Sequence, residues 1–269
     1  MKAPIVLIGA GRMGGALAKG WLDGGQGPVI AVEPHPAPAL KKLTKLGLTI
    51  VSGIDALPKQ KFRACVVALK PQVLKPEVAA LAPLAAKGQL MLSIAAGINT
   101  GILQKAWGRN AHIVRAMPNT PGAIGQGITG LFAAKTAEKK DCVLAEKLLS
   151  ALGQTVWVEK ERLIDAVTAI SGSGPAYVFA LVEALTAAAI KLGLSETQAE
   201  QLARATVTGS GALLAADAKP AAELRHDVTS PHGTTEAAIN VLLARGGLMP
   251  LIAATTKAAQ RRSKELGAQ

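Results

Sequence analysis

Two patterns of apolar and polar positions alternate along the first 160 residues of the chain. Short runs of β-branched residues, Leu and Val are separated by longer stretches with helical spacing, which is typical of βαβ units around a parallel sheet. The expected strands cover residues 5–8, 29–32, 49–51, 64–69, 90–94, 112–115, 129–133 and 155–158. Helices are expected between them over residues 13–22, 37–46, 72–84, 100–107 and 138–152.

After about residue 160 the strand pattern disappears, and helices are expected over residues 162–170, 175–192, 196–215, 220–226, 234–244 and 249–266. The stretch that begins at Pro175 is apolar on most faces and would expose a large apolar surface in a monomer. We therefore expect an α/β domain over residues 1–160 and an all-helical domain over residues 161–269. The helical domain is expected to form a homodimer or a higher homo-oligomer.

A glycine-rich turn follows the first expected strand and opens the first expected helix. It consists of Gly9, Ala10, Gly11, Arg12, Met13 and Gly14. In this context Gly9 permits a tight turn, Gly11 lets the backbone approach a pyrophosphate, and Gly14 allows the helix to pack closely on the strand. The free N–H groups and the dipole of the helix N-terminus favour the negative charge of the pyrophosphate. The sequence therefore predicts that residues 1–160 form a Rossmann-type domain that binds a dinucleotide.

Glu33 lies at the end of the second expected strand, where an acidic residue usually accepts hydrogen bonds from the adenosine ribose. Its charge would repel a 2′-phosphate, which favours NADH over NADPH, although Arg12 or a protonated His35 would offset part of that repulsion. A solvated carboxylate without a ligand is the alternative interpretation. NADPH or NADH is therefore the expected cofactor, with NADH left open by Glu33.

Two further loops are expected beside the ribose and the nicotinamide, because open α/β sheets bind ligands at the carboxyl ends of their strands. The loop after the fourth strand contains Ala68, Leu69, Lys70 and Pro71, and the loop after the fifth contains Ala95, Ala96 and Gly97. A third polar segment, residues 115–121, combines Arg115 with two prolines and an amide. Arg115 either takes part in catalysis or satisfies carbonyl groups inside the fold.

A hydroxyl-rich turn over residues 227–236 opens a late helix. Its unpaired backbone N–H groups would suit the carboxylate of a small substrate. The alternative is ordinary N-capping by Ser230 or Thr234. A cap needs one hydroxyl group, whereas Ser230, Thr234 and Thr235 supply three within six residues. The pattern therefore favours binding of an anionic substrate.

Composition and charge limit the other classes of function. The formal net charge is +12, but the basic residues are scattered and only 3% of residues are aromatic, so we expect no nucleic-acid partner. Glu183 and Lys191 interrupt the most apolar helical stretch, and the N-terminal apolar run is short, so we expect a cytoplasmic protein without a membrane span. The two cysteines and four histidines have no metal-ligand spacing, and no metal site is expected.

With these motifs in order, the chain resembles the pyrroline-5-carboxylate reductase family, which implies reduction of 1-pyrroline-5-carboxylate to L-proline, the last step of proline biosynthesis. The most specific stretches are residues 165–177 and 228–235. The resemblance implies that backbone amides from Ser230 to Thr234, including Gly233, hold the substrate carboxylate and that Thr235 donates a hydrogen bond to the ring nitrogen. It also implies a substrate contact from Glu161, an interlocked dimer, and sites completed by both subunits.

One position departs from the family's Ser-Pro-Gly-Gly-Thr-Thr turn, because His232 replaces the first of the two glycines. Its side chain is expected to line the substrate turn and to change backbone angles or access there. Two other functions remain open from the residues alone. A hydroxyacid dehydrogenase of similar build would need an acid or base in the helical half, for which Lys191 is the candidate. A non-enzymatic dinucleotide-sensing or nucleic-acid-binding protein would instead use the basic charge.

Overall fold

The computed structural model describes residues 3–268, which divide into two compact units. The sheet unit comprises residues 3–172 together with residues 259–268, and the helical unit comprises Ser173–Ala258. The last helix therefore begins in the helical unit and ends in the sheet unit, which the sequence patterns did not indicate. The predicted functional boundary at residue 160 stays a prediction.

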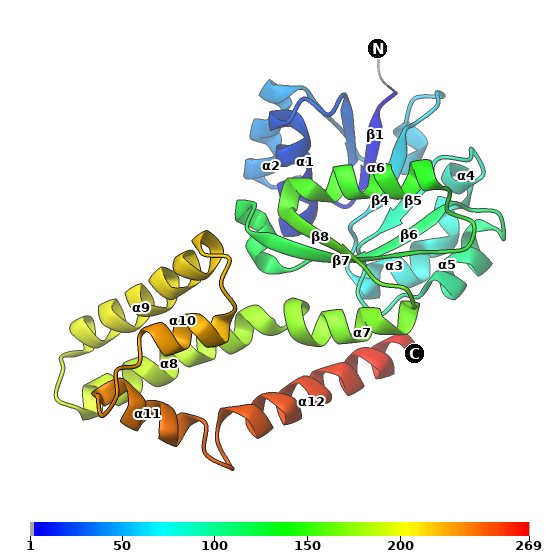
Figure 1. Ribbon diagram of the computed structural model, residues 1–269. Coiled ribbons are helices and arrows are strands. Elements are labelled where there is room, and N and C mark those ends of the chain that lie inside the picture. Colours follow the sequence, from blue (N-terminus) through cyan, green and yellow to red (C-terminus); the bar gives the residue numbers. More distant parts are fainter. Residues whose placement is uncertain (1–2, 269) are drawn as a thin grey trace. The chain divides into compact units, whose positions relative to one another are not determined.

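An eight-stranded sheet with the order β3-β2-β1-β4-β5-β6-β7-β8 forms the centre of the sheet unit (Figure 1). Its strands are β1 (Ile5–Ile8), β2 (Val29–Val32), β3 (Leu48–Val51), β4 (Ala64–Val67), β5 (Leu90–Ser93), β6 (Ile113–Met117), β7 (Gly127–Ala133) and β8 (Gly153–Trp157). The first six strands are parallel, β7 runs antiparallel to β6, and β8 runs parallel to β7. The strand order reverses between β1 and β4, which is the point where such sheets bind ligands. The predicted Rossmann-type fold is confirmed.

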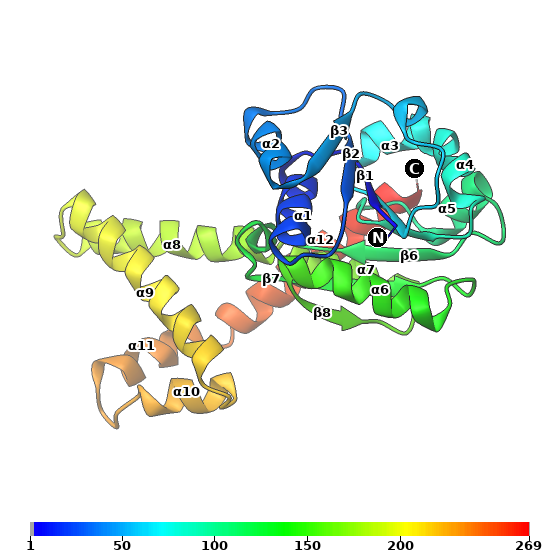
Figure 2. The ribbon, with the colours of Figure 1, turned by 90° about the horizontal axis from the view of Figure 1, so that it is seen from above.

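Helices cover both faces of this sheet: α1 (Arg12–Asp23), α2 (Pro38–Lys42), α3 (Pro71–Glu77), α4 (Ala82–Ala85), α5 (Thr100–Trp107), α6 (Lys139–Leu149) and α7 (Ile164–Val167). Alternate residues of each strand point to opposite faces. Ile5 and Leu7 of β1 share one core cluster with α1 and α6, whereas Val6 and Ile8 share the other with α3, α4 and α5. Figure 2 shows α1 on one side of β1 and β2 and the group α3, α4 and α5 on the other.

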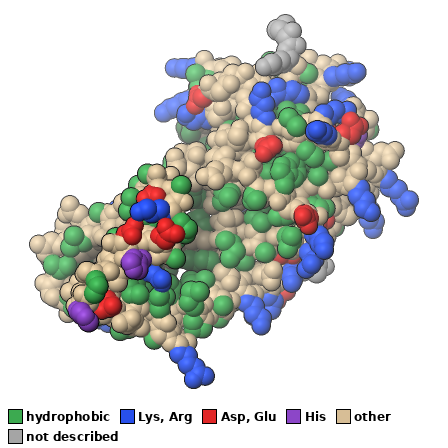
Figure 3. Space-filling view, viewed as in Figure 1, with side chains coloured by type: hydrophobic (Ala, Val, Ile, Leu, Met, Phe, Trp, Pro, Cys, Tyr) green, Lys and Arg blue, Asp and Glu red, His purple; other side chains and the backbone are tan. Residues whose placement is uncertain are grey.

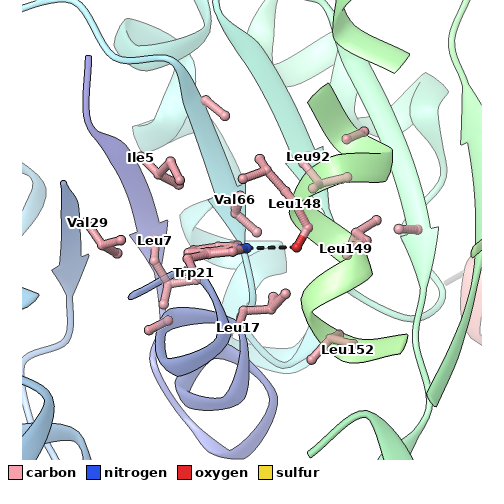
Figure 4. Close-up of a cluster of buried hydrophobic side chains, with 14 of the residues drawn as sticks. Ile5, Leu7, Leu17, Trp21, Val29, Val66, Leu92, Leu148, Leu149 and Leu152 are labelled. Carbon is pink, nitrogen blue, oxygen red and sulfur yellow. Dashed lines mark hydrogen bonds between the residues drawn. The ribbon is translucent and has the colours of Figure 1, made fainter. Parts of the chain in front are cut away.

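Trp21 is the largest side chain in the first of these clusters and is fully buried (Figure 4). Its indole N–H donates a hydrogen bond to the carbonyl oxygen of Leu148 across 2.7 Å, which joins α1 to α6. The polar edge of the ring is thus satisfied while the rest of it contributes apolar area to the core. This contact fixes the position of α1, the helix that the glycine-rich turn opens.

Several expected helices are divided into shorter pieces, most clearly the one over residues 72–84. Instead of a single helix over residues 72–84, the chain forms α3, a 3-10 turn over Val78–Leu81, and α4. Pro76 and Pro83 explain the difference, because proline lacks the N–H that a continuous helix would use. Residues Thr168–Gly172 likewise form a π-helical turn between α7 and the next helix.

The helical unit contains α8 (Gly174–Lys191), α9 (Glu196–Ala216), α10 (Ala221–Asp227), α11 (Thr234–Leu242) and the first part of α12 (Leu248–Ala268). Ser195 caps α9 by accepting a hydrogen bond from the Gln198 N–H. Although α8 packs against α9, none of its residues is buried in the described chain. Apolar side chains are visible at the surface of this unit in Figure 3, and exposed examples on α8 are Val178, Phe179, Leu181, Leu185 and Ile190.

Candidate functional site

The glycine-rich turn has the backbone that a dinucleotide requires. Gly9 has a positive φ of 83°, which a side chain would disfavour. A Cβ at Gly14 would meet the carbonyl oxygen of Gly9 and lie 3.3 Å from the Ala68 Cβ, so this glycine lets α1 approach the sheet. A Cβ at Gly11 would meet nothing within 4 Å. The space beside Gly11 is therefore open to a ligand.

Glu33 lies beside this turn, and both of its carboxylate oxygens accept backbone hydrogen bonds. Oε2 accepts from the Ala10 N–H at 2.9 Å, and Oε1 accepts from the His35 N–H at 3.2 Å. The carboxylate thus joins the end of β2 to the glycine-rich turn. Each oxygen keeps lone-pair capacity for a second donor, such as a ribose hydroxyl.

A cavity of about 400 Å³ opens at the N-terminus of α1. Its lining comes from the glycine-rich turn, α1, α2 and the loop after β6, namely Ala10, Gly11, Arg12, Gly15, Ala16, Lys19, Ala37, Ala39, Leu40, Leu43 and Ala123. No side chain of the described residues caps α1, so its first N–H groups remain available to an anion. The sequence predicted a helix after β2 from its apolar spacing, but it did not indicate that residues of this helix line a cavity.

A second cavity, of about 230 Å³, lies at the carboxyl ends of β4, β5 and β6. It brings together the predicted cofactor residues Met13, Ala68, Leu69, Lys70, Pro71, Ala95 and Ala96, together with Ile94, Met117 and Pro118. Loops that are far apart in the sequence therefore meet as the strand order requires. Met117 and Pro118 were predicted only as part of a rigid polar segment. A single sequence does not indicate which other loops such a segment contacts.

Gly97 is the one predicted cofactor residue of these loops that does not line the second cavity. It has a φ of 71°, and a Cβ there would lie 3.2 Å from the Cβ of Leu266 near the end of α12. The hydroxyl of Ser263 on α12 also donates a hydrogen bond to Asp165 across 2.7 Å. The end of α12 thus packs against the loop after β5.

Glu161 pairs with residues of the sheet unit. Its Oε1 accepts from the Thr100 N–H at 2.7 Å and from Arg115 Nη1 at 3.0 Å, and its Oε2 accepts from the Thr100 hydroxyl at 2.7 Å. Arg115 is buried, and its Nε has no hydrogen-bond partner among the described residues. Of the two interpretations of Arg115, the geometry favours an internal one, although its partner is a carboxylate rather than a carbonyl. The predicted substrate contact of Glu161 stays a prediction.

The hydroxyl-rich turn of the helical unit leads into α11 with Gly233 as its N-cap residue. No side chain among the described residues caps this helix, so the simple capping interpretation of Ser230 and Thr234 is not supported. The Gly233 N–H donates to the Ser230 carbonyl oxygen at 3.0 Å, which closes the turn. Thr235 is partly buried in the first turn of α11.

His232 is the only non-glycine residue with positive φ among residues 3–268, at 58°. This left-handed conformation is the one that glycine adopts at no steric cost. The His232 N–H donates to Glu236 Oε2 at 2.8 Å, which stabilises the conformation, and the imidazole is exposed. The His232 side chain thus stands on a backbone conformation that favours glycine, and its expected effect on the substrate turn stays a prediction.

Although Glu183 and Lys191 interrupt the most apolar helical stretch, it is long and apolar enough to be a candidate membrane span, and the expected absence of a span stays a prediction. The helical run over residues 161–191 contains an 18-residue window of mean hydropathy 1.4, none of which is buried in the described chain. The single charge of Glu183 does not remove enough apolar character from such a window. A single helix of this kind is weak support for a membrane span, because an apolar face that pairs with another subunit passes the same test.

Two protein-family models match the chain. The model described as pyrroline-5-carboxylate reductase dimerisation matches residues 161–266, and the model described as NADP oxidoreductase, coenzyme F420-dependent, matches residues 4–97. The first match covers α7 to α11 and most of α12. The second covers the glycine-rich turn and most of the residues that line both cavities, but not Met117, Pro118 or Ala123.

Similar proteins extend over the whole chain. A pyrroline-5-carboxylate reductase of Pseudomonas aeruginosa is 40% identical over 267 residues, which cover 98% of this chain and 97% of that protein. One from Pisum sativum is 35% identical, with 96% and 94% coverage. A solved structure of a pyrroline-5-carboxylate reductase from Coxiella burnetii superposes with a TM-score of 0.90 at 36% identity, covering 99% of both chains. One from Plasmodium falciparum, solved with NADP bound, has a TM-score of 0.81 at 27% identity, with 98% of both chains covered.

Proposed function

We infer that this chain, which belongs to the pyrroline-5-carboxylate reductase family, reduces 1-pyrroline-5-carboxylate to L-proline with a hydride from NAD(P)H. Full-length similarity to reductases of this name carries the conclusion. The hydride adds to the imine carbon, a proton adds to the ring nitrogen, and the C=N double bond becomes a single bond. The resemblance inferred from the glycine-rich turn and the helical motifs is thereby confirmed.

The dinucleotide supplies the hydride, and the residues of the sheet unit suit its binding. The uncapped α1 N-terminus and the space beside Gly11 fit a pyrophosphate, while Arg12 in the first cavity adds a positive charge. The small residues Ala95 and Ala96 in the second cavity leave room for a flat ring. These features support the proposal that the two cavities hold the two ends of one dinucleotide.

Glu33 sets the proposed coenzyme preference. Its carboxylate is held beside the glycine-rich turn by the Ala10 and His35 N–H groups, so it would favour a ribose with a free 2′-hydroxyl and oppose a 2′-phosphate. We propose that NADH is used at least as well as NADPH. Steady-state kinetics with both coenzymes at one ionic strength test this, and a strong preference for NADPH would contradict it.

The hydroxyl-rich turn is the proposed substrate site. Its helix has no side-chain cap among the described residues, so the first N–H groups of α11 remain able to hold a carboxylate. In this proposal the turn from Ser230 to Thr234 fixes the carboxylate through the amides that do not already donate within the turn, as those of His232 and Gly233 do. The Thr235 hydroxyl donates a hydrogen bond to the ring nitrogen. Such positioning selects the ring face presented to the nicotinamide.

The helical half is the proposed dimerisation and substrate-binding domain, over residues 161–269, with the dinucleotide domain over residues 1–160. The match to a dimerisation model over residues 161–266 and the exposed apolar face of α8 both support a homodimer or a higher homo-oligomer. Pairing of α8 also accounts for its apolar character without a membrane, which supports a cytoplasmic location. Sedimentation in detergent-free buffer should yield a dimer or larger assembly, and a monomer would contradict the proposal.

Absorbance of NAD(P)H tests the activity and separates the alternatives. With 1-pyrroline-5-carboxylate the purified protein should consume the reduced coenzyme and form L-proline. Oxidation of a hydroxy acid with NAD(P)+ but no reaction with the imine would favour a hydroxyacid dehydrogenase. Lys191, the acid or base which that alternative would use, is exposed at the end of α8. Salt-sensitive retention on DNA without turnover would favour a binding protein.

A further inference from the structure

A separate cavity of about 390 Å³ lies where β4 and β5 begin, at the sheet edge opposite the carboxyl ends that carry the cofactor loops. It is lined by Lys61, Phe62, Arg63, Lys87, Gly88, Gln89, Leu90, Lys140, Asp141 and Leu144. None of these residues lines the two cavities assigned to the dinucleotide. The proposed reaction therefore leaves this cavity without a role.

Positive charge predominates in the lining, with four cationic side chains and one carboxylate. The carboxylate of Asp141 is already engaged, because it accepts from the Glu138 N–H at 2.8 Å and lies 2.8 Å from His112 Nδ1. Lys140 pairs with Glu138 at 2.7 Å. The other three cations, on Lys61, Arg63 and Lys87, have no carboxylate partner among the described residues.

Arg63 is the most unusual of these cations. Its Nε and Nη2 atoms are buried and have no hydrogen-bond partner among the described residues. Burial lowers the pKa of its guanidinium, as expected for a desolvated charge without an opposite charge beside it. Because unpaired charge is costly to bury, a bound anion at this cavity would relieve the deficit. The remaining nitrogen, Nη1, is not among the buried atoms and is the one that a ligand would reach.

Lys87 is a second cation of the same cavity without a carboxylate partner among the described residues. Its ammonium lies 5.1 Å from the centre of the Phe62 ring, a contact that holds the cation over an aromatic face without neutralising it. A guanidinium and two ammonium groups around one cavity match the several acceptor oxygens of a phosphate, since each cation donates charge-assisted hydrogen bonds.

We propose that this cavity binds a small phosphoanion, either free phosphate or the phosphate group of a metabolite, through Arg63, Lys61 and Lys87. The cavity has room for more than a phosphate group, since typical small-molecule sites start at about 300 Å³. Because it lies at the opposite sheet edge from the cofactor loops, the phosphoanion and the dinucleotide bind at the same time. The proposal does not depend on the reaction that the protein catalyses.

Isothermal titration calorimetry of the full chain tests the proposal in phosphate-free buffer with excess NADPH, which blocks anion binding at the dinucleotide cavities. Inorganic phosphate and glycerol 3-phosphate serve as separate probes, so the two sources of the phosphate group are distinguished. The variants are Lys61→Gln with Lys87→Gln, and Arg63→Gln alone. The matched control is Lys105→Gln with Arg109→Gln, which removes the same charge as the first pair from exposed positions outside the described cavities.

At least one probe should bind to a single saturable site at millimolar concentration or below. The lysine pair and Arg63→Gln should each weaken binding about tenfold or more, as expected for lost charge-assisted contacts. The control pair should change it less than about twofold. Absence of saturable binding for both probes in the presence of NADPH, or equal weakening by the control pair, would overturn the proposal. If Arg63→Gln does not fold, the exposed lysine pair still decides the outcome.

Discussion

Replacing Glu161 separates a structural role from a substrate contact. The carboxylate accepts three hydrogen bonds, from the Thr100 N–H, the Thr100 hydroxyl and Arg115 Nη1, and is itself only 23% exposed. Arg115 is 7% exposed in its side chain, and its Nε already lacks a hydrogen-bond partner among residues 3–268. Glu161→Ala would therefore remove the carboxylate partner of a buried guanidinium, whereas Glu161→Gln would keep a polar group in reach of all three donors.

The two variants should differ clearly in stability. Breaking a buried ion pair by removing one partner costs about 3–5 kcal/mol, because the other charge stays buried. In Glu161→Gln the amide oxygen accepts from the Thr100 N–H and Arg115, and its NH₂ group donates to the Thr100 hydroxyl. Only the charge is lost, so we expect a cost of about 1 kcal/mol.

Tryptophan fluorescence during urea unfolding measures this difference, because Trp21, Trp107 and Trp157 all lie in the sheet unit. Protomer concentration must be equal in all samples, since assembly shifts apparent stability. Equal midpoints for the Ala and Gln variants would refute the structural reasoning. An unchanged midpoint for Glu161→Gln with a large rise in KM for the imine would instead support the substrate contact.

Four further predictions concern the site and the core. Thr235→Ala should lower kcat/KM more than about tenfold in steady-state assays while Thr235→Ser keeps most activity, and similar kinetics for both variants would remove the hydroxyl from the mechanism. Gly14→Ala should cost about 2 kcal/mol in urea unfolding because its Cβ meets the Gly9 carbonyl oxygen, whereas Gly11→Ala should weaken only coenzyme binding by calorimetry; the reverse order would contradict the assignment. His232→Gly should stabilise the chain by about 1 kcal/mol in the same unfolding assay by removing the strain of positive φ, and a loss of stability would show that the side chain is needed. Burial raises the pKa of the Cys65 thiol to about 12, so its thiolate is scarce at pH 7–9 and alkylation followed by mass spectrometry should label it only after unfolding; rapid labelling of the folded protein would contradict this.

Apolar periodicity predicted the strands well because the parallel sheet is buried on both faces. All four residues of β1, β2, β4 and β5 are buried, so their runs of aliphatic residues stand out from the flanking polar turns. The glycine-rich turn was equally clear, since Gly9 and Gly14 are required by backbone angle and close approach. Helix ends were less clear where Pro76 divides one helix into short pieces.

Contacts between distant segments were beyond the reach of sequence patterns. The pairing of Glu161 with Thr100 and Arg115 spans 61 and 46 residues, and no local pattern encodes it. The close approach of Leu266, near the end of α12, to Gly97 could not be predicted for the same reason. Leu266 lies at the end of a helix whose start belongs to the other unit, so the periodicity predicts the helix but not its two environments.

Isotope transfer tests the central claim most directly. The protein should be turned over with 1-pyrroline-5-carboxylate and NAD(P)H that carries deuterium on the transferring face of the nicotinamide, and the product examined by mass spectrometry and proton NMR. L-Proline with one deuterium on the carbon that formed the imine is the predicted result. Unlabelled proline, or coenzyme oxidation without proline, would contradict hydride transfer to the imine carbon.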